Sequence, residues 1–135
     1  MAANFKIVVV TPTNKVLEQD AQFLMIRTTE GDLGILANHS PFVAELATGE
    51  MKIKADGNET YFFVSGGFME ISNNVVTILA DEAMDVKDID VESARKEAQI
   101  AQEKLEKVKE DREFAVVQKT LSQALAKVRI AEKNL

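Results

Sequence analysis

The sequence has 135 residues, a formal net charge of −6, 46% hydrophobic residues and no cysteine. Its length suits one compact domain or one small domain with an appendage, and no apolar run approaches the roughly 20 residues that cross a bilayer. Disulfides, thiol catalysis and cysteine-bound zinc are excluded, and the N-terminus lacks the pattern of a secretory signal. Residues 1–87 carry 6 basic and 12 acidic side chains, which makes nucleic acid a poor partner, whereas residues 88–135 carry 10 of each.

Residues 4–81 have strand patterns throughout, and no helical period interrupts them. Runs that are rich in valine, isoleucine and phenylalanine, or that alternate in polarity, occur at Phe5–Val10, Gln22–Thr28, Met51–Ala55, Thr60–Ser65 and Val75–Ala80. Clusters of Gly, Pro, Asn and Asp separate the runs, as turns do. This spacing predicts an antiparallel sandwich or barrel. Ile7–Val10 and Tyr61–Val64 are apolar on both sides, so we expect both faces of those strands to be covered.

From Asp90 to Leu135 the apolar residues recur every three or four positions, which is typical of amphipathic helices. They form two stripes, the first made of Val91, Ala94, Ala98, Ala101, Leu105 and Val108 and the second of Phe114, Val117, Leu121, Ala124, Val128, Ala131 and Leu135. The stripes are out of phase, because Arg112 stands where the first would continue. This break predicts two helices that fold back on each other around a turn at residues 110–113, which contains neither Gly nor Pro.

The residues that could carry catalysis or bind a metal are few. His39 is the only histidine, and a triad with Asp32 and Ser40 can be drawn. Three common polar residues in one turn-rich loop are weak evidence for a triad, so a structural or partner contact is the preferred interpretation. The acidic residues match no calcium-loop spacing, and no Cys or second His assists them. We therefore expect neither a catalytic residue nor a metal site.

Two motifs give the sequence a family resemblance. The first, Glu30-Gly31-Asp32-Leu33-Gly34-Ile35-Leu36-Ala37-Asn38-His39-Ser40-Pro41-Phe42, resembles the glycine-containing loop of the ε subunit of F-type ATP synthases. The second combines Val64-Ser65-Gly66-Gly67-Phe68-Met69-Glu70-Ile71 with Asn74-Val75-Val76-Thr77-Ile78-Leu79-Ala80-Asp81 and is similar to that family's second signature. The opening strand, the acidic link and the final helical pair also occur in the family's order, so the resemblance covers essentially the whole chain.

The resemblance implies an α+β fold: an antiparallel β-sandwich of about ten strands at 1–87, followed by an antiparallel α-helical hairpin at 88–135. It implies a non-catalytic rotor subunit in the central stalk, which joins the γ subunit to the ring of c subunits and helps to couple ion flow to ATP synthesis. Glu30, Gly31 and Asp32 would contact the c ring. The γ subunit would meet a segment made of His39, Ser40, Pro41 and Phe42. The expected location is peripheral, at the cytoplasmic face of a bacterial cell membrane.

The helical pair resembles the family's regulatory element, which switches between a folded hairpin and an extended form that meets the α and β subunits and inhibits ATP hydrolysis. Basic residues of the second helix would take part in that contact, namely Lys119, Lys127, Arg129 and Lys133. They could equally form a solvated basic face. The turn without Gly or Pro suits such a switch, because residues 110–113 can become helical when the pair extends.

Some bacterial members of the family bind ATP through Ile/Leu-Asp-x-x-Arg-Ala at the start of the first helix. The matching residues here are Ile89-Asp90-Val91-Glu92-Ser93-Ala94, so Ser93 replaces the arginine and only Asp90 remains as a nucleotide contact. No cofactor is expected, and ATP binding should be weak or absent. The resemblance leaves open whether the coupled ion is H⁺ or Na⁺. The alternatives to a rotor subunit are a stand-alone sandwich and coiled-coil adaptor, and a small-molecule hydrolase that uses His39.

Overall fold

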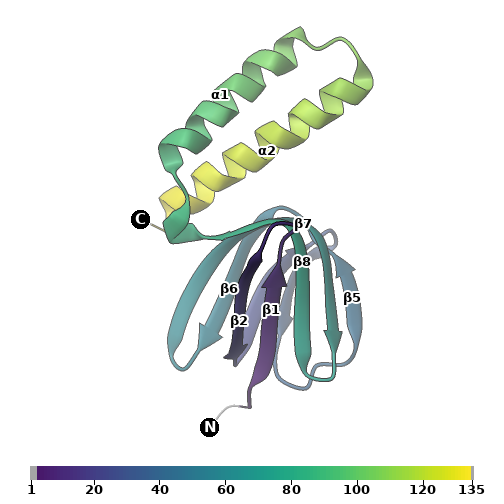
Figure 1. Ribbon diagram of the computed structural model, residues 1–135, viewed down its shortest axis with the longest axis vertical. Coiled ribbons are helices and arrows are strands. Elements are labelled where there is room, and N and C mark those ends of the chain that lie inside the picture. The colour runs from purple at the N-terminus through teal and green to yellow at the C-terminus, as the bar shows by residue number, and fades with distance from the viewer. Residues whose placement is uncertain (1–2, 135) are drawn as a thin grey trace. The chain divides into compact units, whose positions relative to one another are not determined.

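The computed structural model describes residues 3–134 and divides into two compact units between Asp85 and Val86 (Figure 1). The first unit is a β domain, and the second is a helical hairpin. The sequence pattern puts this boundary two residues later, between 87 and 88. The strands of the β domain are β1 (Phe5–Val10), β2 (Lys15–Ala21), β3 (Phe23–Thr28), β4 (Gly31–Ile35), β5 (Phe42–Glu45), β6 (Gly49–Ala55), β7 (Asn58–Ser72) and β8 (Val75–Asp85).

The strands form one sheet in the order β2-β1-β8-β7-β6-β3-β4, and β5 also pairs with β7. The pairing of β1 with β8 is parallel, while the other ladders are antiparallel. The sheet folds over into a sandwich because β7 and β8 are long enough to belong to both layers. Residues 58–64 of β7 pair with β6, whereas residues 68–71 pair with β5. If the two halves of each long strand are counted separately, the eight described strands become the expected ten.

β7 passes from one layer to the other at Gly66 and Gly67, whose φ angles are +69° and +101°. Side chains on L-residues rarely adopt these angles, which is why a glycine pair marks the corner. One layer then holds β5, the second half of β7, the first half of β8, β1 and β2. The other layer holds the remaining half-strands with β6, β3 and β4.

The core of the sandwich consists of alternate residues from both layers. Its members include Phe5, Ile7, Val9, Leu24, Ile26, Met51, Ile53, Met69, Ile71, Val76 and Ile78, all at most 3% exposed. Burial of both faces is confirmed for β7, where Phe62 and Phe63 are both buried. For β1, Val8 and Val10, on the face away from the core, are only half-buried in the isolated chain, so the covering of this face by a partner stays a prediction.

The second unit contains a short 3₁₀ helix, Val86–Asp88, and the helices α1 (Val91–Lys107) and α2 (Asp111–Lys133). The turn lies at Val108–Glu110, earlier than the sequence indicates. Val108 and Glu110 have extended backbones, and Asp111 begins α2. Asp111 and Glu113 lie in the first turn of α2, where negative charge is favourable because backbone N–H groups point outward.

The seam between α1 and α2 is built mainly from alanine. Ala98, Ala101, Leu121 and Ala124 are buried there, with Leu105 and Val117 partly buried against them. This matches most of the expected stripes, but Phe114 is 42% exposed and Val128 is only half-buried, while Leu135 lies outside the described residues. Ala126 and Ile130 are buried although neither belongs to the expected stripe. The C-terminal half of α2 is therefore buried on more than one side.

Candidate functional site

Thr28 shapes the tight turn between β3 and β4, which carries the first set of expected contact residues. Its hydroxyl donates to the carbonyl of Gly31 at 2.8 Å and accepts from the N–H of Glu30 at 3.1 Å. Gly31 has φ +119°, an angle that favours glycine. The turn is therefore held by its own polar groups, and Glu30 lies at its tip.

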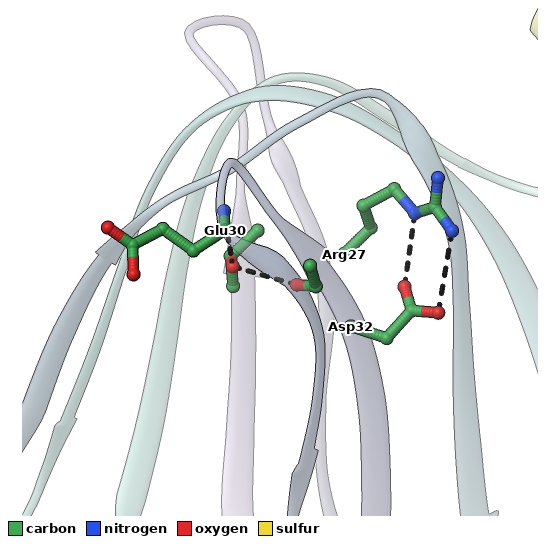
Figure 2. Close-up of polar contacts among 5 residues, drawn as sticks. Arg27, Glu30 and Asp32 are labelled. Carbon is green, nitrogen blue, oxygen red and sulfur yellow. Dashed lines mark hydrogen bonds and ion pairs between the residues drawn. The ribbon is translucent and has the colours of Figure 1, made fainter.

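The two acidic side chains of this turn differ in their availability. Arg27 donates from Nε to Asp32 Oδ1 at 3.0 Å and from Nη2 to Oδ2 at 3.4 Å, and these bonds raise the pKa of Arg27. Figure 2 shows the Glu30 carboxylate pointing away from that pair. Among the described residues it makes no hydrogen bond or ion pair. Glu30 is thus an exposed carboxylate that a partner could reach, whereas Asp32 is already paired.

The second expected contact segment, residues 39–42, leads into β5. The ring of His39 donates from Nδ1 to the carbonyl of Ser40 at 2.7 Å and packs edge-on against Phe42, with 6.2 Å between ring centroids. Asn74, a residue of the second family motif, anchors Asn38, which directly precedes this segment. Its side chain accepts from the N–H of Asn38 at 2.7 Å and donates to the carbonyl of Asn4 at 2.8 Å.

The two segments lie at opposite ends of β4. Five residues of strand, from Gly31 to Ile35, span about 13 Å at the usual rise. Asp32 is paired with Arg27 at one end, and the ring of His39 bonds to a backbone carbonyl beyond the other. The structure therefore does not assemble Asp32, His39 and Ser40 into a triad.

A further candidate surface, missed at the sequence level, lies on the side of the first layer that faces away from the core. Phe68 pairs with Leu79 across β7 and β8, and Leu79 pairs with Val10 of β1. Val43 lies one row along on β5, opposite Glu70. Phe68, Leu79 and Val43 are 57%, 55% and 68% exposed. We call Val10, Val43, Phe68 and Leu79 the apolar outer face.

The expected basic residues of α2 do not form a uniformly solvated surface. Lys119, Arg129 and Lys133 are exposed, whereas Lys127 is half-buried. At 100° per residue, the buried side chains of Ala126 and Ile130 fall between them around the helix. The basic side chains therefore lie on both sides of an apolar strip made of Ala126 and Ile130.

Asp90 is engaged as the N-cap of α1. Its carboxylate accepts from the N–H of Ser93 at 3.1 Å and from the Ser93 hydroxyl at 2.9 Å. The backbone bond first, and the hydroxyl bond second, lower the pKa of Asp90. The serine that replaces the family arginine thus completes a capping interaction, and it presents no cation to a phosphate.

Residues 3–134 contain no group of three or more His, Asp or Glu side chains arranged to hold a metal ion. Within the same residues, neither α1 nor α2 combines the length and apolar character that a membrane span requires.

Two family models match the chain, one for each unit. Residues 4–86 match the β-sandwich domain of the ATP synthase delta/epsilon chain, and residues 87–132 match the long α-helix domain of the same chain. Among curated relatives, the ATP synthase epsilon chain, sodium ion specific, of Propionigenium modestum is 61% identical over 133 residues, covering 98% of this chain and 97% of the relative. The ATP synthase epsilon chain of Nitratidesulfovibrio vulgaris is 38% identical over 130 residues, covering 96% and 97%.

Chains in solved structures of ATP synthases also match this chain. A chain of the Euglena gracilis mitochondrial ATP synthase, described as OSCP/F1/c-ring in rotational state 1, matches with a TM-score of 0.79 and 25% identity, covering 93% of this chain and 80% of that one. A chain of the central stalk and c ring of the Tetrahymena thermophila mitochondrial enzyme shares the fold, with a TM-score of 0.54 and 21% identity, covering 64% and 70%. With both units and nearly the full length matched, this chain belongs to the ε subunits of F-type ATP synthases.

Proposed function

We propose that this subunit is a non-catalytic part of the rotor that joins γ to the c ring and so couples ion-driven rotation to ATP synthesis elsewhere in the complex. The observation that carries the proposal is the apolar outer face. Three of its four side chains are more than half exposed in the isolated chain, and together they cross four strands. Exposed apolar clusters of this kind are typical of surfaces that a permanent partner covers.

The γ subunit is the partner that we assign to this face. The segment His39–Phe42, expected to contact γ, runs directly into β5, which forms one edge of the face. The edge carries Glu45, opposite Phe68, and Glu70, opposite Val43. A γ surface that fits would therefore be apolar at its centre and basic at this edge, since buried carboxylates need a charged partner.

The c ring is the partner that we assign to the β3–β4 turn. Its loops would meet Glu30, whose carboxylate projects from the tip of a turn that Thr28 and Gly31 hold in shape. Asp32, bound to Arg27, would position the turn and make less direct contact. At this site Glu30 would provide the negative charge, and Gly31, which has no side chain, would let the c-ring loops approach the backbone closely.

The helices would act as a movable inhibitor of ATP hydrolysis. An alanine seam buries little apolar area, so the two helices can separate at a modest free-energy cost. Once α2 is released, Lys119, Lys127, Arg129 and Lys133 and the apolar strip between them would meet acidic loops of the α and β subunits. Positioning at the cytoplasmic face of the membrane would follow from binding to the c ring.

Copurification tests the rotor assignment. A tagged chain should bring down γ and c subunits from membranes of its source, and Phe68→Glu should lower the recovered γ at least tenfold by placing an unpaired charge in the interface. Lys52→Glu, on the other layer, is the matched control and should bind normally. Equal γ recovery with Phe68→Glu would contradict the assigned γ face, and recovery of no synthase subunit by the unmodified chain would contradict the rotor function.

ATP is not expected to hold the hairpin closed in this member of the family. Ser93 supplies no guanidinium, and Asp90 is already engaged as a helix cap. A lost charge-assisted contact to phosphate weakens binding by roughly 1.5–3 kcal/mol. Titration calorimetry of the isolated subunit should therefore detect weak or no ATP binding, and a micromolar dissociation constant would contradict the prediction.

A further inference from the structure

Arg95 links the two helices at the open end of the hairpin, far from the connecting turn. Its Nη1 donates to Glu92 Oε1, one turn back on α1, at 3.1 Å, and its Nη2 is paired with Glu132 Oε1 near the end of α2. One guanidinium thus bridges a carboxylate from each helix. We call Arg95, Glu92 and Glu132 the Arg95 clasp.

The position of Glu132 makes this contact conditional on the folded hairpin. Glu132 lies in the last turn of α2, where the negative end of the helix dipole disfavours a negative charge. In the folded hairpin this helix end lies beside the start of α1, so the carboxylate is compensated by Arg95 and by the outward N–H groups of α1. Separation of the helices would remove both sources of compensation. In the separated state the Glu132 carboxylate would therefore destabilise the C-terminal turn of α2.

Because the alanine seam contributes little apolar burial, a single ion pair such as the Arg95 clasp can change the balance between folded and separated helices. Ala98, Ala101 and Ala124 allow close packing but remove less apolar area from water than larger side chains would. The connecting turn holds the other end of the pair together by covalent bonds, whereas the contact between Arg95 and Glu132 at this end must break when the helices separate.

We propose that the Arg95 clasp is a latch that sets the ratio of folded to separated hairpin in this chain, by an ion pair within the protein. This inference rests on the proposed movement of the helices. Because the groups are exposed, the latch is sensitive to ionic strength and shifts the ratio by a small factor, as suits a reversible switch.

Distances between two spin labels in the full-length isolated subunit test the latch. The chain has no cysteine, so Gln99→Cys and Ser122→Cys, both at exposed positions, place one label on each helix without interference. Glu132→Gln and Arg95→Gln should each raise the ratio of separated to closed hairpin about two- to fivefold. Added salt should raise the ratio in the parent chain and have less effect in the variants.

The control is Glu106→Gln, which removes one exposed carboxylate of α1 that makes no hydrogen bond or ion pair with another described residue. It should leave the ratio unchanged. The double variant Arg95→Gln/Glu132→Gln should open no more than the more open single variant, because both changes break the same contact. Single variants that behave like the control, or effects that multiply in the double variant, would overturn the latch.

The function is tested separately, in the assembled complex. Glu132→Gln, if it opens the hairpin, should increase the inhibition of ATP hydrolysis. Greater opening without greater inhibition would contradict the proposed inhibitory role while leaving the latch supported. Failure of either proposal is therefore visible on its own.

Discussion

Gly67 shows at the residue scale how strictly one backbone position can constrain a sequence. Its φ is +101°, and a Cβ there would lie 1.9 Å from the carbonyl oxygen of Leu79, a backbone atom that cannot rotate away. We predict that Gly67→Ala lowers the free energy of unfolding of the β domain by roughly 2–4 kcal/mol, through the unfavourable φ and the clash together. Urea titration followed by the fluorescence of Tyr61, the only tyrosine in a chain without tryptophan, measures it.

Gly57 provides the control for this prediction. Its φ is also positive, at +83°, but a Cβ there would meet nothing within 4 Å. Gly57→Ala should therefore destabilise the domain by only about 1 kcal/mol, the contribution of the backbone angle alone. Equal losses for the two variants would show that the contact with the β8 backbone contributes nothing.

The turn between α1 and α2 is the element for which the structure most changes the design of an experiment. Arg112, which lies in the turn that the sequence predicts at residues 110–113, is the second residue of α2, and a proline there would disfavour the helical backbone of Asp111. Asp111 itself is the first residue of α2 and follows Glu110, whose extended backbone suits a residue before proline. Asp111→Pro therefore fits the folded hairpin.

We predict that Asp111→Pro traps the hairpin by preventing a continuous helix across residues 108–113, where proline would lose a hydrogen bond and clash with the preceding turn. The expected result is a change in hairpin stability of less than about 1 kcal/mol, with strongly reduced inhibition of ATP hydrolysis by the assembled complex. Helix melting followed by circular dichroism and a hydrolysis assay measure the two effects. With Asp111→Ala as the reference, persistent inhibition in the proline variant would rule out a continuous helix as the inhibitory form.

Strands were predictable from the sequence where they are apolar and not where they are short or polar. Val, Ile and Phe residues, or alternating polarity, predict the runs near β1, β3, β6, β7 and β8, and their apolar side chains enter the core. β2 has mostly charged and amide side chains, and β4 contains two glycines, so neither gives a clear strand signal. β2 and β4 are strands because they pair with β1 and β3, and such pairing between separate segments cannot be predicted from a local sequence pattern.

The contact residues taken from the family motifs remain proposals, but their roles differ in ways that only geometry reveals. Motif matching treats Glu30 and Asp32 alike, whereas Asp32 is bound to Arg27 and Glu30 is not. The apolar outer face could not be predicted, because its residues come from four strands whose register was unknown. Val43, Phe68, Leu79 and Val10 become neighbours only through the ladders of β5, β7, β8 and β1.

At the scale of the whole molecule, the glycine corner of β7 determines how the β domain would carry a load. The apolar outer face lies on one layer, and the β3–β4 turn with Glu30 lies on the other. β7 and β8 run unbroken through both layers and remain paired on either side of the corner, from Phe62 with Asp85 to Ser72 with Val75. A twisting force applied at one proposed contact would thus reach the other through covalent chain and strand hydrogen bonds, so the layers resist sliding. The proposed role between γ and the c ring requires such torsional stiffness.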